Sequence, residues 1–79
     1  MKSIRDPRYV EMISHLKQTR KSKGVSQVML GERLGWDQRD VSKVESLVRR
    51  LDFIELWDWL DALEYDMKVF LEEIKQLRK

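Results

Sequence analysis

Four polar side chains between residues 38 and 43 could together hydrogen-bond to an extended partner. Gln38, Arg39, Ser42 and Lys43 supply a carboxamide, a guanidinium, a hydroxyl and an ammonium group. If this segment is helical, their spacing places them on its outward side. A glutamine can form two hydrogen bonds with the edge of adenine, and Arg or Lys can bond to O6 and N7 of guanine. The four residues are therefore candidates for reading bases in the major groove of DNA. The alternative is an ordinary polar face exposed to solvent.

The surrounding segment predicts two short helices joined by a tight turn. The helices are expected over residues 27–34 and from residue 38 to 45 or 46, with Ser26 and Asp37 as N-caps whose side-chain oxygens accept from free N–H groups. Two helices this short are not stable alone, so the rest of the chain must support them. The residues expected on their inner side are Val28, Leu30, Leu34, Val41 and Val44.

The turn between these helices has its own signals. Gly35 lies where the first helix must end, and Gly31 would let the two helices approach closely because it has no Cβ. Trp36 is expected to pack over the junction. Asp40 is difficult to place, because a carboxylate facing a groove repels phosphate unless it accepts a hydrogen bond there or pairs with a neighbouring cation. This arrangement predicts a helix-turn-helix.

The run LKQTRKSKGVSQVMLGERLGWDQRDVSKVE, residues 16–45, resembles the Xre/Cro-type, lambda-repressor-like family of phage repressors and bacterial regulators. With the segment that follows, the resemblance covers about residues 10–71. It implies an all-α fold, a compact five-helix domain that binds double-stranded DNA specifically, most often as a homodimer and often as a repressor. The matching residues are Leu16, Arg20, Gly24, Val25, Ser26, Gln27, Leu30, Gly31, Leu34, Gly35, Asp37, Gln38, Val41, Ser42, Val44 and Glu45.

The resemblance also implies roles for individual residues. It implies a partly buried ion pair between Arg20 and Glu45 that braces the first helix against the third. The chain departs from the family where Leu47 and Glu64 replace common glycines, so a left-handed helix end is not expected at Glu64 and the third helix could run longer. The residues expected to contact phosphates are Ser26, Gln27, Ser46, Arg49 and Arg50.

Composition and charge agree with one small DNA-binding domain. The chain has 79 residues, no cysteine and the single histidine His15, which is expected at the surface because no carboxylate or second histidine lies near it in sequence. Residues 1–51 contain 12 Lys and Arg against 6 Asp and Glu, a net charge of +6, whereas residues 52–79 contain 4 against 8, a net charge of −4. A basic half suits a phosphate-facing surface and an acidic half a remote partner surface, although two solvated faces are the simpler alternative.

Several function classes are not expected. No segment approaches the ~20 apolar residues of a membrane span, and the N-terminus carries charges where a signal peptide is apolar, so a cytoplasmic protein is expected. No constellation of residues suggests catalysis, a metal site or a cofactor. The whole chain is expected to form one domain, with residues 1–5 as a loose arm carrying Lys2 and Arg5, and residues 72–79 as an extension of the last helix.

The C-terminal half predicts two further helices and a partner surface. Asp52 should cap a helix with an inner stripe of Phe53, Leu56, Trp57, Leu60 and Leu63. A last helix after Asp66 continues an apolar row beyond the size of the small core, which favours a homodimer. An alternative is an antitoxin-like module that binds a toxin-like protein through its acidic, aromatic C-terminal half. The residues predicted for the dimer interface are Trp59, Phe70, Ile74 and Leu77.

Overall fold

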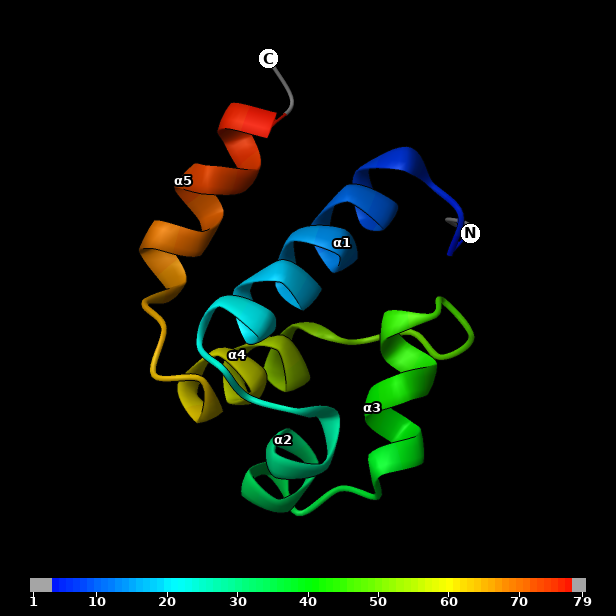
Figure 1. Ribbon diagram of the computed structural model, residues 1–79. Helices are drawn as coiled ribbons and strands as arrows, with labels where there is room; N and C mark the ends of the chain where they lie inside the picture. The colour runs from blue at the N-terminus through cyan, green and yellow to red at the C-terminus, as the bar shows by residue number, and fades with distance from the viewer. Residues whose placement is uncertain (1–3, 78–79) are drawn as a thin grey trace.

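The computed structural model describes residues 4–77 and contains only helices and their connections in that range (Figure 1). The all-α, five-helix fold predicted from the sequence is confirmed. Residues 4 and 5 form a turn before the first helix, whereas Lys2 of the predicted arm and residues 78–79 of the predicted extension lie outside the described residues. The helices are α1 Pro7–Ser22, α2 Gln27–Leu34, α3 Gln38–Glu45, α4 Phe53–Ala62 and α5 Met67–Leu77.

Each of the first four helices begins at a side-chain cap that the sequence places locally. Asp6 accepts from the backbone N–H of Arg8, and Pro7 occupies the first helical position, where a missing N–H costs nothing. Ser26 and Asp37 cap α2 and α3 as expected. Asp52 forms a reciprocal capping box with the third helical residue of α4. These short-range bonds explain why the predicted helix starts are correct.

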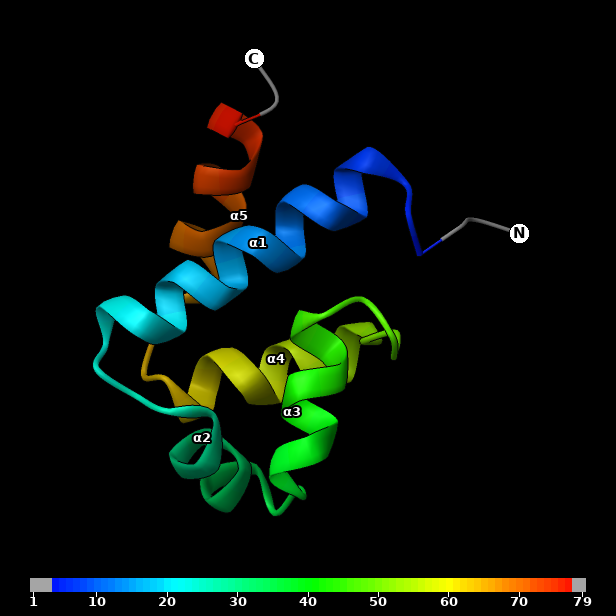
Figure 2. The ribbon, with the colours of Figure 1, turned by 45° about the vertical axis from the view of Figure 1, so that its right-hand side comes forward.

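The core is an apolar cluster to which every helix contributes. In both views α1 crosses the molecule between α5 and the α2–α3 pair, so that α3 and α5 lie at opposite sides (Figures 1 and 2). None of the helices among residues 4–77 is both long and apolar enough to cross a membrane. The buried apolar residues are Ile13, Leu16, Val25, Leu30, Val41, Val44, Leu51, Leu56, Trp59, Leu60, Leu63 and Phe70.

The buried side of α4 differs from the predicted stripe. Trp59 is fully buried with Leu60, whereas Phe53 and Trp57 are more than half exposed. Apolar residues surround much of α4, so more than one face of this helix shows apolar residues spaced three and four apart. Val28 of α2, expected to point inward, is also half exposed. These expectations were wrong, and the tertiary packing of α4 against the rest of the core selected its other face.

Two helices end in a left-handed residue that is not glycine. Leu47 after α3 has φ of 67° and Glu64 after α4 has φ of 55°. The expectation that Glu64 would avoid this conformation was therefore wrong, and α3 ends at Glu45 and runs no longer. Each turn closes through backbone bonds, from Val48 N–H to Lys43 O and from Tyr65 N–H to Leu60 O. These bonds satisfy helix-terminal carbonyls and offset the cost of the left-handed conformation.

A polar cluster fastens α5 to α1. His15 Nε2 lies 2.8 Å from Glu73 Oε1, and the Tyr65 hydroxyl donates to the same carboxylate at 2.7–2.8 Å. The hydrogen bonds from His15 and Tyr65 lower the pKa of Glu73. The bond to Glu73 in turn raises the pKa of Tyr65. His15 also packs its ring against Phe70, with centroids 5.3 Å apart. The half-buried His15 therefore has the carboxylate neighbour that its local sequence lacked.

Candidate nucleic-acid interface

The α2–α3 unit is held together at a close backbone contact. A Cβ added to Gly31 would lie 2.9 Å from the carbonyl oxygen of Trp36 and 3.5 Å from the backbone nitrogen of Gln38. Only glycine fits this position without a shift of the turn. Gly35 ends α2 in the left-handed region at φ of 73°, which places Trp36 N–H against Gly31 O at 2.8 Å. The angle between the two helices therefore depends on these two glycines.

A buried ion pair fixes α3 against α1. The Arg20 guanidinium donates to both oxygens of Glu45, from Nε at 2.7 Å and Nη2 at 3.0 Å, and also to Val25 O at 2.7 Å. The side chains of Arg20 and Glu45 are only 8% and 2% exposed. The structure thus contains the pair that the family resemblance implied. Such a bidentate geometry sets both the position and the rotation of the last turn of α3.

Glu45 also starts a chain of oriented amides. Because a carboxylate only accepts hydrogen bonds, Gln27 must donate to Glu45 through Nε2, at 3.0 Å. The Gln27 Oε1 then faces Gln38, at the start of α3. Gln38 Nε2 donates to that oxygen at 3.0 Å. Gln38 therefore keeps its Oε1 and its second N–H for another partner. This donor and acceptor pair is the pattern that the N6 and N7 edge of adenine requires.

The other candidate base-reading residues flank Gln38 on α3. Lys43 and Arg39 are exposed, and Ser42 is half-buried. Arg39 pairs with Asp37 at 3.3 Å, and this hydrogen-bonded contact raises the pKa of Arg39. The pKa of Asp37 is lowered mainly by the hydrogen bond from the Arg39 backbone N–H and further by the side-chain contact. Asp40 is half-buried. The pKa of Arg49 is raised mainly by its hydrogen bond to Glu55, and the Asp40 charge adds to this effect. α3 therefore presents an amide and two cations, with Asp40 partly withdrawn.

The candidate phosphate-binding residues are not equally available. Ser26 and Ser46 lie exposed at the start of α2 and the end of α3. Arg49 is engaged inside the domain: Nη2 lies 2.7 Å from Glu55 Oε2, and the guanidinium covers the Trp36 ring with its carbon 4.7 Å from the centroid. The hydrogen bond from Arg49 lowers the pKa of Glu55. Arg49 therefore braces the loop after α3 against the α2–α3 turn.

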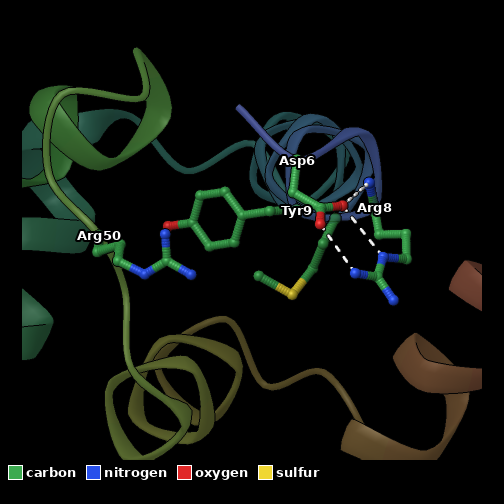
Figure 3. A pocket seen from close by; sticks show the side chains of 5 residues that line it. Asp6, Arg8, Tyr9 and Arg50 are labelled. Carbon is green, nitrogen blue, oxygen red and sulfur yellow. Dashed lines mark hydrogen bonds and ion pairs between the residues drawn. The ribbon is translucent and has the colours of Figure 1, made fainter. Parts of the chain in front are cut away.

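Arg50 lies beside the start of α1. Its guanidinium stacks on the Tyr9 ring at 5.0 Å, and the Tyr9 hydroxyl accepts from Leu51 N–H at 2.9 Å. Tyr9 and Arg50 border an open hollow of about 300 Å³ whose wall also includes Met12 (Figure 3). Figure 3 shows the Arg8 guanidinium turned toward Asp6 on the opposite rim. The loop between α3 and α4 is thus anchored to α1, with an exposed arginine at its edge.

The sequence did not predict several of these positions. Gln27 was expected only as a phosphate contact, yet its side chain links Glu45 to Gln38. Two predicted interface residues, Trp59 and Phe70, are completely buried in the monomer, so the prediction that they contact a second copy is corrected. Ile74 packs partly against the core, and only Leu77 of the four is exposed. Within residues 4–77 no group of His, Cys, Asp and Glu side chains could hold a metal ion.

The fold and this polar surface define a helix-turn-helix protein. Residues 16–70, more than half of the chain, match a helix-turn-helix family. A solved structure of an XRE-family like protein from Pseudomonas syringae pv. tomato str. DC3000 is 33% identical, with a TM-score of 0.85 over 92% of this chain and 89% of that chain. No curated protein matches. The chain belongs to the XRE-like helix-turn-helix family, and it is a DNA-binding regulator.

Proposed function

We propose that this protein is a cytoplasmic repressor that binds a specific double-stranded DNA site as a homodimer, with α3 in the major groove. Gln38, Arg39 and Lys43 read base edges, with Ser42 as a weaker fourth contact. Phosphates are held by the start of α2, at Ser26 and the backbone N–H of Gln27, and by the loop residues Ser46 and Arg50. Arg49 contributes mainly by holding that loop in place. All of these residues lie in the α2–α3 unit or in the loop that follows it.

The observation that carries the proposal is the fixed orientation of the Gln38 amide. A solvent-exposed glutamine would normally sample many rotamers, and ordering it on a base would cost entropy. Here the hydrogen-bonded chain from Arg20 through Glu45 and Gln27 fixes the amide before any partner is present. The neighbouring cations at Arg39 and Lys43 suit guanine acceptors or phosphates.

The base-reading role is tested by selecting a preferred site from random oligonucleotides and measuring variant affinities for it. Gln38→Ala should weaken binding to that site by ~1–3 kcal/mol and leave non-specific binding nearly unchanged. Gln27→Ala should act in the same direction, and the double variant should lose little more than Gln38→Ala alone, because both act through one amide. The matched control is Gln76→Ala, at an exposed glutamine on α5. Unaltered sequence preference in both Gln38→Ala and Arg39→Ala would refute base reading by α3.

The phosphate role has a different signature. Arg50→Ala should weaken binding to all sequences and reduce the slope of log affinity against log salt by about one. Arg49→Ala should instead lower stability slightly, because its guanidinium already pairs with Glu55. An unchanged salt slope in Arg50→Ala would remove this residue from the contact set. Repression itself is tested with a reporter gene placed downstream of the selected site.

A further inference from the structure

Two residues that flank α3 in the sequence touch each other in the structure. The turn before α3 and the loop after it lie at opposite ends of this helix (Figure 1). The Arg49 guanidinium, from the loop, nevertheless covers the ring of Trp36, from the turn, with its carbon 4.7 Å from the ring centroid. A cation over the face of an indole is attracted by the ring's π electrons. The Trp36–Arg49 contact therefore connects the segments at the two ends of α3.

Both partners of this contact are also fixed to α4. Trp36 meets the buried Trp59 edge to face, with ring centroids 5.9 Å apart. The indole N–H of Trp59 has no hydrogen-bond partner among the described residues, so packing alone holds this ring. Arg49 donates to Glu55, which completes the capping box at the start of α4. The contact thus fastens both connections of α3 to one helix.

Asp40 links the contact to α3 itself. This half-buried carboxylate lies in the first turn of α3. The hydrogen bond to Glu55 and, to a smaller extent, the Asp40 charge raise the pKa of Arg49. A carboxylate on a helix that reads DNA repels phosphates, and the nearby guanidinium partly balances its charge. Asp40, which local sequence did not explain, therefore supports the same contact.

We propose that Trp36 is a positioning residue that determines specificity: through its contact with Arg49 it holds the start of α3 at the angle at which Gln38 reads a base. The inference deepens the proposed function, on which it rests, by assigning base recognition partly to a residue that does not touch DNA. Trp36 acts through the backbone, because it directly precedes Asp37, the N-cap of α3, and lies two residues before Gln38. A shift of Trp36 therefore displaces the Gln38 side chain from its base.

The dimensions of α3 explain why its start needs support of its own. Its 8 residues make a helix about 12 Å long, and the Arg20–Glu45 pair holds the last turn. A tilt of about 10° around that turn would move the first turn by roughly 2 Å. A binding constellation must be held to within about 0.5 Å of its productive geometry. Gln38, in the first turn, is therefore the base-reading residue most sensitive to a loosened Trp36.

The test compares Trp36→Leu with Trp36→Phe in the full chain. Both variants keep an apolar side chain against Trp59, but only phenylalanine keeps an aromatic face for Arg49. Because the contact can change recognition only by the free energy that it supplies, Trp36→Leu should weaken binding to the selected site about two- to fivefold. Non-specific affinity and the salt slope should stay at their wild-type values, since no charge changes. Trp36→Phe should restore most of the lost affinity.

A second measurement follows α3 without DNA. Amide hydrogen exchange in the free protein should be about two- to fivefold faster in α3 of Trp36→Leu, with α1 as the internal reference. The matched control is Trp57→Leu, at an exposed tryptophan of α4, which should leave exchange in α3 unchanged. Arg49→Gln removes the cation from the same contact, so the double variant with Trp36→Leu should lose little more site affinity than Arg49→Gln alone.

The outcomes separate this inference from the proposed function. Wild-type site affinity in Trp36→Leu, alongside lost sequence preference in Gln38→Ala, overturns the inference and leaves the proposed function standing. Equal losses in Trp36→Leu and Trp36→Phe also overturn it, because the aromatic face would then be irrelevant. Faster exchange in α3 together with a loss confined to the selected site supports it. A wild type without sequence preference refutes the proposed function and, with it, the role of Trp36 in reading bases.

Discussion

Two arginine–glutamate pairs hold α3 and the loop that follows it, and they differ mainly in burial. Arg20 and Glu45, on the α1 side, are 8% and 2% exposed, whereas Arg49 and Glu55, on the α4 side, are 35% and 27% exposed. Both pairs have a shortest N–O distance of 2.7 Å. Removing one member of a buried pair leaves a charge without solvent, whereas water can replace a lost partner near the surface. The two sides of α3 should therefore respond very differently to the same kind of change.

The largest effect is expected at the buried pair. Glu45→Ala should reduce the free energy of unfolding by ~3–5 kcal/mol, because Arg20 would remain buried without its partner. The variant also removes the acceptor that orients Gln27, so specific DNA affinity should fall even where the protein remains folded. Urea denaturation measures the first effect. The control Glu72→Ala, at an exposed carboxylate 3.7 Å from Lys75, should stay within about 0.5 kcal/mol of wild type. Equal losses in these two variants would contradict the structural role of Glu45.

The next effect concerns the close contact between α2 and the start of α3. Gly31→Ala should cost ~1–3 kcal/mol, because its Cβ would lie 2.9 Å from the Trp36 carbonyl oxygen and backbone must move. That movement displaces Gln38, so specific DNA binding should weaken more than non-specific binding. Glu32→Ala, at the exposed neighbouring position, is the matched control for helix propensity. A Gly31→Ala protein as stable as wild type would show that the α2–α3 turn yields more easily than this distance implies.

The Arg49–Glu55 pair should contribute less than ~1 kcal/mol to the free energy of unfolding, since both side chains are about a third exposed. Glu55→Gln isolates its charge, because glutamine can still accept from Asp52 N–H in the capping box. Arg49 holds the pKa of Glu55 below its ordinary value of 4.5. This stabilisation is fully present above pH 4.5 and is lost as the pH falls through the lower folded-state pKa. The thermal unfolding midpoint of Glu55→Gln should therefore lie below that of wild type at pH 7, and the difference should disappear in acid.

The smallest effect on stability is expected at the exposed Arg39–Asp37 pair, whose side chains are 83% and 53% exposed. Arg39→Ala should leave the unfolding midpoint unchanged, because Asp37 still caps α3 through the Arg39 backbone N–H. Its affinity for the selected DNA site should nevertheless decrease. A change in stability without a change in DNA affinity would reverse the roles assigned to the exposed and the buried arginine.

Local signals in the sequence determined the helices and the helix-turn-helix. The caps at Asp6, Ser26, Asp37 and Asp52 act over two or three residues, so their effects can be predicted without a fold. Gly31 and Gly35 were likewise correctly interpreted, because close approach and left-handed backbone are local requirements of the turn. The candidate base-reading residues on α3 also follow from helical spacing alone, and their role stays a prediction.

Only the tertiary structure decided which apolar face of α4 is buried and how distant polar groups pair. Phe53 and Trp57 fit a helical stripe as well as Trp59 does, and packing against Trp36 and the core selected Trp59. His15 acquires Glu73 from 58 residues away, and Gln38 acquires its orientation from Gln27 on another helix. The physical reason is range: a cap or turn depends on neighbouring backbone groups, whereas burial and long-range hydrogen bonds depend on how whole helices pack together.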